Sequence, residues 1–208
     1  FGGLRLLHET LEWGAVRDPA DVLVSGDSPL PGATGTAANF SNSTDDTALV
    51  GKIGVRQSLA DFGNVYASYA RGYKGKGFNL IFATQATDQP VNPELSDAFE
   101  IGAKVQTLDR KLSLNAALFY TKYKGYQSQA RLPGDISFYL LNAGTVSTRG
   151  IEVEATLKPT RLLDISLGGT WADARIDEFP IGPCYVGQTA ALGCVGGSQD
   201  LQGGALPN

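Results

Sequence analysis

Few side chains in this chain belong to the types that carry out catalysis or hold a metal ion. His8 is the only histidine, and Cys184 and Cys194 are the only cysteines. A hydrolytic triad needs a nucleophile and an orienting acid around one imidazole, and nothing near His8 marks either group. A zinc site needs about four nitrogen or sulfur ligands. We therefore predict that the chain is not an enzyme and holds no metal or other cofactor.

The two cysteines lie close together in a glycine-rich segment, and a disulfide within a loop is their expected use. Such a bond points to an oxidising compartment outside the cytoplasm. We expect Cys184 and Cys194 to clip this loop together. The formal net charge of -4 gives no support for a nucleic-acid partner.

A short basic cluster, Arg71, Lys74 and Lys76, lies where a predicted strand runs into a long polar segment. Positive charge at such a position attracts anionic ligands, so we take these three as candidate ligand-binding residues. Basic residues at strand ends also commonly meet lipid phosphates or keep a loop soluble. The sequence leaves these alternatives open.

The elements that would position these residues are β-strands. Between Lys111 and Leu167, apolar and polar side chains alternate with a period of two in three successive runs. Successive side chains on a strand point to opposite faces, so these runs predict a sheet with one apolar and one polar face. Similar runs occur earlier in the chain. We expect loops from Gly14 to about Asp46 and from Gln127 to Asp135.

An apolar wall of this kind fits either a soluble sandwich or a membrane barrel that faces lipid. The predicted connections alternate in length along the chain. Short turns are expected near Phe62, Asp109 and Pro159, and longer loops around Asp27, Ala86, Leu132 and Cys184. Outer-membrane barrels have short periplasmic turns and longer extracellular loops, whereas a sandwich has no reason to separate them. The alternation favours an all-β, antiparallel transmembrane β-barrel.

Charged side chains oppose the apolar rows in the predicted strands. In a wide barrel these side chains would line a wet lumen and face each other or a plug domain, whereas on a sandwich they would be the solvated face. The predicted lumen- or plug-facing residues are Lys52, Arg56, Glu100, Lys104, Glu152 and Glu154. We expect Glu100 to pair with Lys104. We also expect Arg149 to join Glu152 and Glu154 in ion pairs across the wall.

Several segments resemble the barrel strands of TonB-dependent outer-membrane receptors. They are YASYARGYKGKGFN at 66–79, NPELSDAFEIGAK at 92–104, LNAALFYTKYKGYQ at 114–127 and NAGTVSTRGIEVEATLKP at 142–159. The last, with its Asn-Ala-Gly and Arg-Gly-x-Glu-x-Glu, is the most specific. The resemblance implies that residues 1–208 are a fragment of the barrel domain without the plug domain, with about seven strands of a 22-stranded barrel. Seven strands cannot close such a barrel, so we expect open edges.

The resemblance also implies a function in the bacterial cell outer membrane. Such a receptor takes up a scarce nutrient, for which a ferric siderophore is the expected ligand. The implied partners are this ligand, the outer-membrane lipid and the TonB energy-transducing complex, which would be contacted through the missing N-terminal region. The alternative is a secreted, soluble β-sandwich domain for binding or adhesion, which would stay soluble without detergent.

Overall fold

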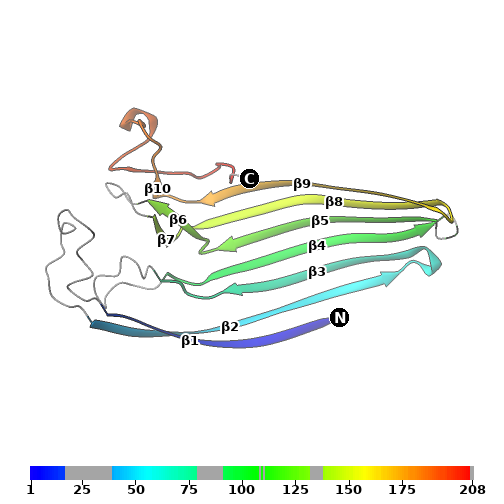
Figure 1. Ribbon diagram of the computed structural model, residues 1–208, viewed down its shortest axis with the longest axis horizontal. Coiled ribbons are helices and arrows are strands. Elements are labelled where there is room, and N and C mark those ends of the chain that lie inside the picture. The colour runs from blue at the N-terminus through cyan, green and yellow to red at the C-terminus, as the bar shows by residue number, and fades with distance from the viewer. Residues whose placement is uncertain (17–38, 79–90, 108, 110, 132–137, 207–208) are drawn as a thin grey trace.

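The structure is a computed structural model that describes residues 1–16, 39–78, 91–107, 109, 111–131 and 138–206. Its main feature is a seven-stranded antiparallel sheet in the order β1-β2-β3-β4-β5-β8-β9 (Figure 1). The strands are β1 (Gly2–Val16), β2 (Asn39–Ser58), β3 (Gly63–Lys74), β4 (Glu94–Thr107), β5 (Leu112–Lys124), β8 (Thr145–Thr160) and β9 (Leu163–Glu178). Among the described residues, no helix is long and apolar enough to cross a membrane.

The remaining elements are short and lie in the connections. β6 (Gln127–Arg131) pairs with β7 (Phe138–Asn142), and β10 (Gly182–Pro183) pairs with β11 (Ser198–Gln199). The described residues also contain two 3-10 turns, η2 (Ala60–Phe62) and η3 (Ala190–Leu192). Figure 1 places β6, β7 and β10 at one end of the sheet and the tight turns at the other. The predicted all-β antiparallel fold class is confirmed. The long loops predicted around Asp27, Ala86 and Leu132 lie outside the described residues.

Two segments predicted as loops are partly strand. β1 continues to Val16 and β2 begins at Asn39, so both ends of the segment 14–46, residues 14–16 and 39–46, lie in one ladder. Here Thr10 pairs with Asp45 and Glu12 with Ser43. On β2 the residues of both faces are polar at this level, so the period-two signal disappears there although the backbone pairing continues. The segment 127–135 likewise contains β6, whose partner strand lies beyond the predicted loop.

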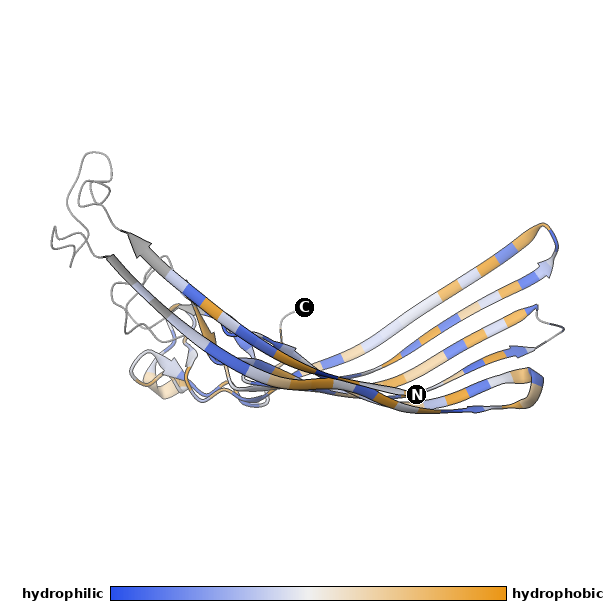
Figure 2. Cartoon of the chain, turned by 90° about the horizontal axis from the view of Figure 1, so that it is seen from below, coloured by the Kyte–Doolittle hydropathy of each residue, from blue (hydrophilic) through white to orange (hydrophobic). Residues whose placement is uncertain are grey.

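The register of the ladders assigns every side chain of the sheet to one of two faces. Directly paired residues share a face. One row across the sheet therefore consists of Val55, Ala67, Ile101, Leu118, Ile151 and Trp171. We call this side the apolar face and the opposite side the polar face. Figure 2 shows the same alternation as hydrophobic and hydrophilic bands along each strand.

The large side chains of the apolar face are exposed, not packed in a core. Leu4 is 81% exposed, Leu167 75% and Ile53 64%. Among the described residues few apolar side chains are buried, and four of them form a small cluster at the long-connection end, made of Ala143, Val146, Ile176 and Phe179. A soluble sandwich would cover its apolar face with a second sheet, and the described residues contain no such layer. Apolar surface on this scale marks an interaction with lipid.

The height of the apolar band agrees with a membrane span. On β5 the apolar face runs from Leu112 to Tyr120, which is about 27 Å at 3.4 Å per residue. A strand tilted by about 40° then crosses roughly 20 Å. This height is close to that of the apolar band of outer-membrane barrels.

The tight turn between β2 and β3 depends on Gly63. This residue has a φ of 141°, which side chains other than glycine rarely adopt. A Cβ atom there would also overlap the backbone carbonyl oxygen of Lys104 on the neighbouring strand. Gly63 therefore permits both the turn and the close approach of β4.

We predict that Gly63→Ala destabilises the fold by about 1–3 kcal/mol from backbone strain alone. The matched control is Gly169→Ala, because a Cβ atom at Gly169 would have nothing within 4 Å. The measurement is the temperature at which the detergent-solubilised protein loses its compact, fast-migrating band on SDS gels. A Gly63→Ala protein as heat-resistant as the Gly169→Ala control would contradict this account.

Candidate functional site

A polar cluster lies at the long-connection end of the sheet, where β3 ends, β4 begins and β5 passes into β6. We call it the rim cluster, and its members are Lys74, Asn92, Glu94, Gln127 and Asn142. Gln127 and Glu94 are only 7% and 9% exposed. Buried polar groups are tolerated only when their hydrogen bonds are satisfied, so the partners of these side chains decide what the cluster does.

Gln127 links three segments of the chain. Its Nε2 donates to the carbonyl oxygens of Gly75 (2.8 Å) and Asn92 (2.9 Å), and its backbone N–H donates to Glu94 Oε2 (2.8 Å). The same Glu94 carboxylate accepts an ion pair from Lys74 Nζ at 3.6 Å. The segments that leave β3, enter β4 and leave β5 are thereby fixed to one another.

Asn142 explains why the Asn-Ala-Gly motif has these three residue types. Its Nδ2 donates to the carbonyl oxygens of Asn92 (2.9 Å) and Gly125 (2.7 Å), and its Oδ1 accepts from the Asn92 N–H at 2.8 Å. Ala143 is 3% exposed in the small apolar cluster. Gly144 has a φ of 102°, and a Cβ atom there would overlap the Glu178 carbonyl. The motif is therefore a structural joint at the start of β8.

The segment that follows β3 folds back over the first two strands. Lys76 Nζ donates to Thr44 Oγ1 (2.8 Å) and to the Asp45 carbonyl oxygen (2.9 Å). The ring of Phe78 stacks on Trp13 with centroids 3.8 Å apart. These contacts anchor the described beginning of the long connection between β3 and β4.

Tyr73 adds a hydrogen bond between the end of β3 and β2. Its hydroxyl donates to Asp46 Oδ2 at 3.0 Å. Burial, followed by the Asp46 carboxylate, raises the pKa of Tyr73 to about 12. The hydroxyl therefore remains a donor throughout the physiological pH range.

The structure separates the three predicted ligand-binding residues. Lys74 pairs with Glu94, and Lys76 is bound to β2 as described above. Arg71 is aligned with Asp97 and lies on the apolar face, whereas Lys74, three residues further along β3, points to the opposite face. They do not form one patch, and their contact with a ligand remains a prediction.

The six predicted lumen-facing residues all lie on the polar face. Lys104 and Glu154 both pair with Asn115, whose Nδ2 donates to Glu154 Oε2 at 3.4 Å. A hollow of about 140 Å³ is lined here by Tyr66, Lys104, Asn115, Glu152, Glu154 and three alanines. Among the described residues, no ion pair joins Glu100 to Lys104.

The expected grouping of Arg149 with Glu152 and Glu154 is wrong. Arg149 is an odd number of residues from Glu152 in the same strand, so their side chains point to opposite faces. Arg149 Nη2 instead donates to Asp173 Oδ2 at 3.1 Å across the β8–β9 ladder. The acidic partner of Arg149 lies on the neighbouring strand β9, so it cannot be identified from the residues near Arg149 in the sequence.

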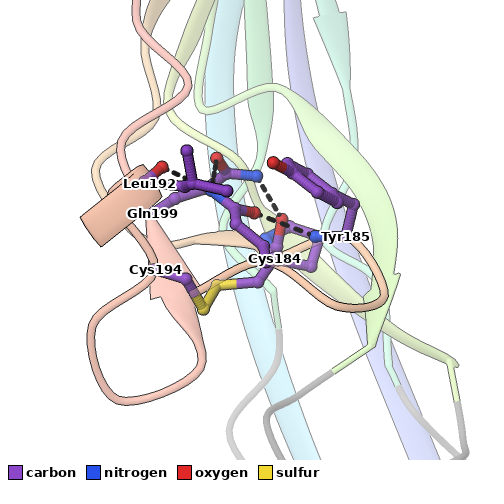
Figure 3. The surroundings of a disulfide bond; sticks show 7 residues. Cys184, Tyr185, Leu192, Cys194 and Gln199 are labelled. Atoms are coloured by element: carbon purple, nitrogen blue, oxygen red, sulfur yellow. Dashed lines mark hydrogen bonds between the residues drawn. A yellow bond between two sulfur atoms is a disulfide. The ribbon is translucent and has the colours of Figure 1, made fainter. Parts of the chain in front are cut away.

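The segment after β9 is held together by a disulfide between Cys184 and Cys194, the pairing expected from the sequence (Figure 3). Gln188, which no sequence motif indicates, lies at its centre. Its Nε2 donates to the Leu192 carbonyl (3.0 Å) and to Gln199 Oε1 (2.7 Å). Among the described residues, no group of three or more His, Cys, Asp or Glu side chains could hold a metal ion.

We predict that Gln127→Ala loosens the rim cluster, because the Gly75 carbonyl loses its donor and an unsatisfied buried group costs about 1–3 kcal/mol. Trypsin should then cleave after Lys74 or Lys76 about tenfold faster, since about 1.4 kcal/mol changes an opening equilibrium tenfold. The control is Gln129→Ala, an exposed position of the same strand β6. Equal cleavage of the two variants would refute the role of Gln127.

The sequence of this chain is similar to those of known outer-membrane proteins. The family model described as "TonB dependent receptor-like, beta-barrel" matches residues 19–208. The chain is 32% identical over 113 residues to the pesticin receptor of Yersinia enterocolitica, which covers 54% of this chain and 16% of that protein. It is 33% identical over 131 residues to the catecholate siderophore receptor Fiu of Escherichia coli K12, which covers 58% of this chain and 17% of the relative.

A solved structure has the same fold. The ferric yersiniabactin uptake receptor FyuA from Yersinia pestis matches with a TM-score of 0.64 and 24% identity, over 84% of this chain and 24% of the receptor. The chain therefore spans only a fraction of the length of the proteins that it matches. The family match covers most of the chain, and the two-faced antiparallel sheet agrees with it. This chain belongs to the β-barrel family of TonB-dependent receptors, which are proteins of the bacterial outer membrane.

Proposed function

We propose that the protein is an outer-membrane receptor and transporter for a ferric siderophore, and that this chain forms part of its barrel wall. The observation that carries the proposal is the two-faced sheet of a TonB-dependent receptor barrel. Its apolar face has the height of a membrane band, and its polar face carries charges of both signs. A wall of this kind separates lipid from a wet interior through which a polar ligand passes.

The ligand class is supported by relatives whose names state what they bind. Fiu is a catecholate siderophore receptor, and FyuA is a ferric yersiniabactin uptake receptor. Both kinds of ligand are iron chelates. The rim cluster lies beneath the long connections, and its buried hydrogen bonds would hold the bases of ligand-gripping loops in place.

We further propose that residues 1–208 belong to a barrel of 22 strands, with the plug domain and the contact to the TonB complex supplied by other parts of the protein. In the described sheet, β1 pairs only with β2, and the outer edge of β9 is bridged by residues 203–206 only near Arg175. An open edge has unpaired N–H and C=O groups, which cannot be satisfied in lipid. Further strands of the same protein would close the barrel at these two edges.

Deletion of the gene tests the transport proposal. We expect uptake of at least one ⁵⁵Fe-loaded siderophore to fall to background in iron-limited cells and to return with a plasmid copy. Uptake should also vanish in a strain that lacks TonB, because the receptor depends on energy from the inner membrane. Unchanged uptake of a panel of catecholate, hydroxamate and mixed-type siderophores would overturn the siderophore assignment.

The proposal that Lys52, Arg56, Glu100, Lys104, Glu152 and Glu154 line the lumen has a separate test. The described cysteines are joined in a disulfide, so a single new cysteine can be labelled with a fluorophore. Spin-labelled acyl chains should quench the label strongly at Ile151→Cys and weakly at Glu152→Cys, because adjacent positions of β8 point to opposite faces. Equal quenching at both positions would show that Glu152 does not face the lumen.

A further inference from the structure

The segment that follows β9 has a packed base. Phe179 is 8% exposed and belongs to the small apolar cluster, against which Leu201 and Leu206 pack. The N–H of Leu201 donates to the Phe179 carbonyl oxygen at 3.0 Å, and the N–H of Gly203 donates to the Ile176 carbonyl oxygen at 2.8 Å. Buried apolar surface and backbone hydrogen bonds therefore hold this base against the end of β9.

Residues 184–197, which we call the clipped tip, lack such support. All of them are half-buried or exposed, and Val186 and Val195 are 100% and 72% exposed. Gly187 and Gly193 take φ values of 85° and 92°, and glycine loses more conformational freedom on folding than any other residue. Folding of the clipped tip therefore costs conformational entropy that burial of its own side chains does not offset.

Polar contacts within the segment add to the order of the clipped tip (Figure 3). Gln188 Oε1 accepts from the Tyr185 N–H at 3.1 Å, in addition to the two hydrogen bonds that Gln188 Nε2 donates. Asp200 is the only charged residue in the segment after β9. Each neutral, partly exposed hydrogen bond contributes little to stability on its own. The disulfide is therefore the strongest constraint on the clipped tip.

The disulfide closes the clipped tip independently of the base. Cys184 and Cys194 are ten positions apart in the sequence, and a bond across such a loop restricts the conformations of the open chain. The short strands β10 and β11 pair just outside this loop. Both cysteines are only half-buried, so a small thiol can reach their sulfur atoms. Opening of the bond therefore frees the clipped tip without separating the two sides of the base.

We propose that the Cys184–Cys194 disulfide is a redox latch, which a low-molecular-weight thiol opens to release the clipped tip while the base stays folded. The thiolate of one thiol molecule attacks a cysteine sulfur, the S–S bond breaks, and the other cysteine leaves and takes up a proton. A second thiol molecule attacks the mixed disulfide and frees the first cysteine. The two cysteines gain two electrons and two protons, and the two thiol molecules leave as one disulfide.

The state of the latch controls capture of a ligand at this end of the wall, a consequence that rests on the proposed function. In the oxidised protein the clipped tip is ordered before a ligand arrives. In the reduced protein a ligand that contacts the tip must also order it, and this entropy cost lowers the affinity. Reduction should therefore raise the ligand concentration needed for half-maximal uptake and leave the maximal rate unchanged.

The test is hydrogen exchange of the full-length receptor in detergent, measured by mass spectrometry before and after treatment with reduced glutathione. Alkylation with iodoacetamide reports whether the disulfide has opened. The clipped tip is followed through peptides that contain the N–H groups of Gln188, Leu192 and Cys194, which donate to backbone carbonyls of the tip. The base is followed through peptides that contain the N–H groups of Leu201 and Gly203.

Opening of the latch should speed exchange in the clipped tip about thirtyfold, from the effect of a disulfide on a loop of this length, and leave exchange in the base unchanged. Cys184→Ser/Cys194→Ser should exchange fast with or without glutathione. The matched control, Val186→Ser/Ala191→Ser, places two serines at exposed positions of the same tip and should behave like the unmodified receptor.

Three results would overturn the latch: no alkylation after glutathione treatment, unchanged exchange in the reduced tip, or faster exchange in the base. The unmodified receptor is reduced only after it has folded, so its result decides the matter even where the Cys184→Ser/Cys194→Ser variant fails to fold.

Uptake of a ⁵⁵Fe-loaded siderophore by iron-limited cells tests the consequence for capture. Glutathione should raise the half-saturating concentration about tenfold for the unmodified receptor and for the control, whereas Cys184→Ser/Cys194→Ser starts at the raised value and does not respond. An unchanged half-saturating concentration in cells whose receptor becomes alkylated would overturn the link between the latch and capture. Absence of uptake by the untreated, unmodified receptor would instead overturn the proposed function, and the exchange experiment would still decide on the latch.

Discussion

The constraint on which this structure depends is that every backbone N–H and C=O group in a lipid environment must find a partner within the protein. The antiparallel ladder from β1 to β9 satisfies these groups strand by strand. It also forces side chains to alternate between two solvents, lipid and water. Leu118 and Ile151 are paired across β5 and β8 on the apolar face, and Ala117 and Glu152 are paired on the other. One register error would exchange the two environments for a whole strand.

The connections follow from the same ladder. At one end the strands are joined by turns that need only a few special backbone positions, such as Gly63. At the other end the chain leaves the sheet for longer excursions, and the ladder no longer supplies hydrogen bonds to these segments. The side chains of Gln127 and Asn142 supply them instead, through contacts to carbonyls more than fifteen residues away in sequence. Side-chain amides at the rim, one of them buried, therefore replace the backbone pairing that ends there.

The sequence predicts the parts of this architecture that are local and periodic. Period two identifies which face each strand residue occupies, so Glu152 and Glu154 are placed correctly on the polar face. The polar continuation of β2 from Asn39 is not predicted, because its residues are polar on both faces and show no alternation. The partners of Gln127, Gln188 and Arg149 are also missed. Each of these contacts joins residues from different segments, and it depends on the strand register or on a reversal of the chain. The spacing of residues within one segment does not reveal either.

The position of Arg149 in β8 determines which face of the sheet its side chain occupies and therefore which residues it can contact. It lies in the motif Arg-Gly-x-Glu-x-Glu, where its charge suggests a partner among the acids that follow. The pleat turns those acids to the polar face and leaves Arg149 beside Asp173, near Tyr120 and the edge of the apolar band. A cationic side chain at the edge of the apolar band has a small desolvation cost. Its guanidinium group reaches the lipid headgroup layer while its methylene groups cover apolar surface. The same alternation that separates the apolar face from the polar face therefore also places the ion pair of Arg149 and Asp173 at the edge of the apolar band.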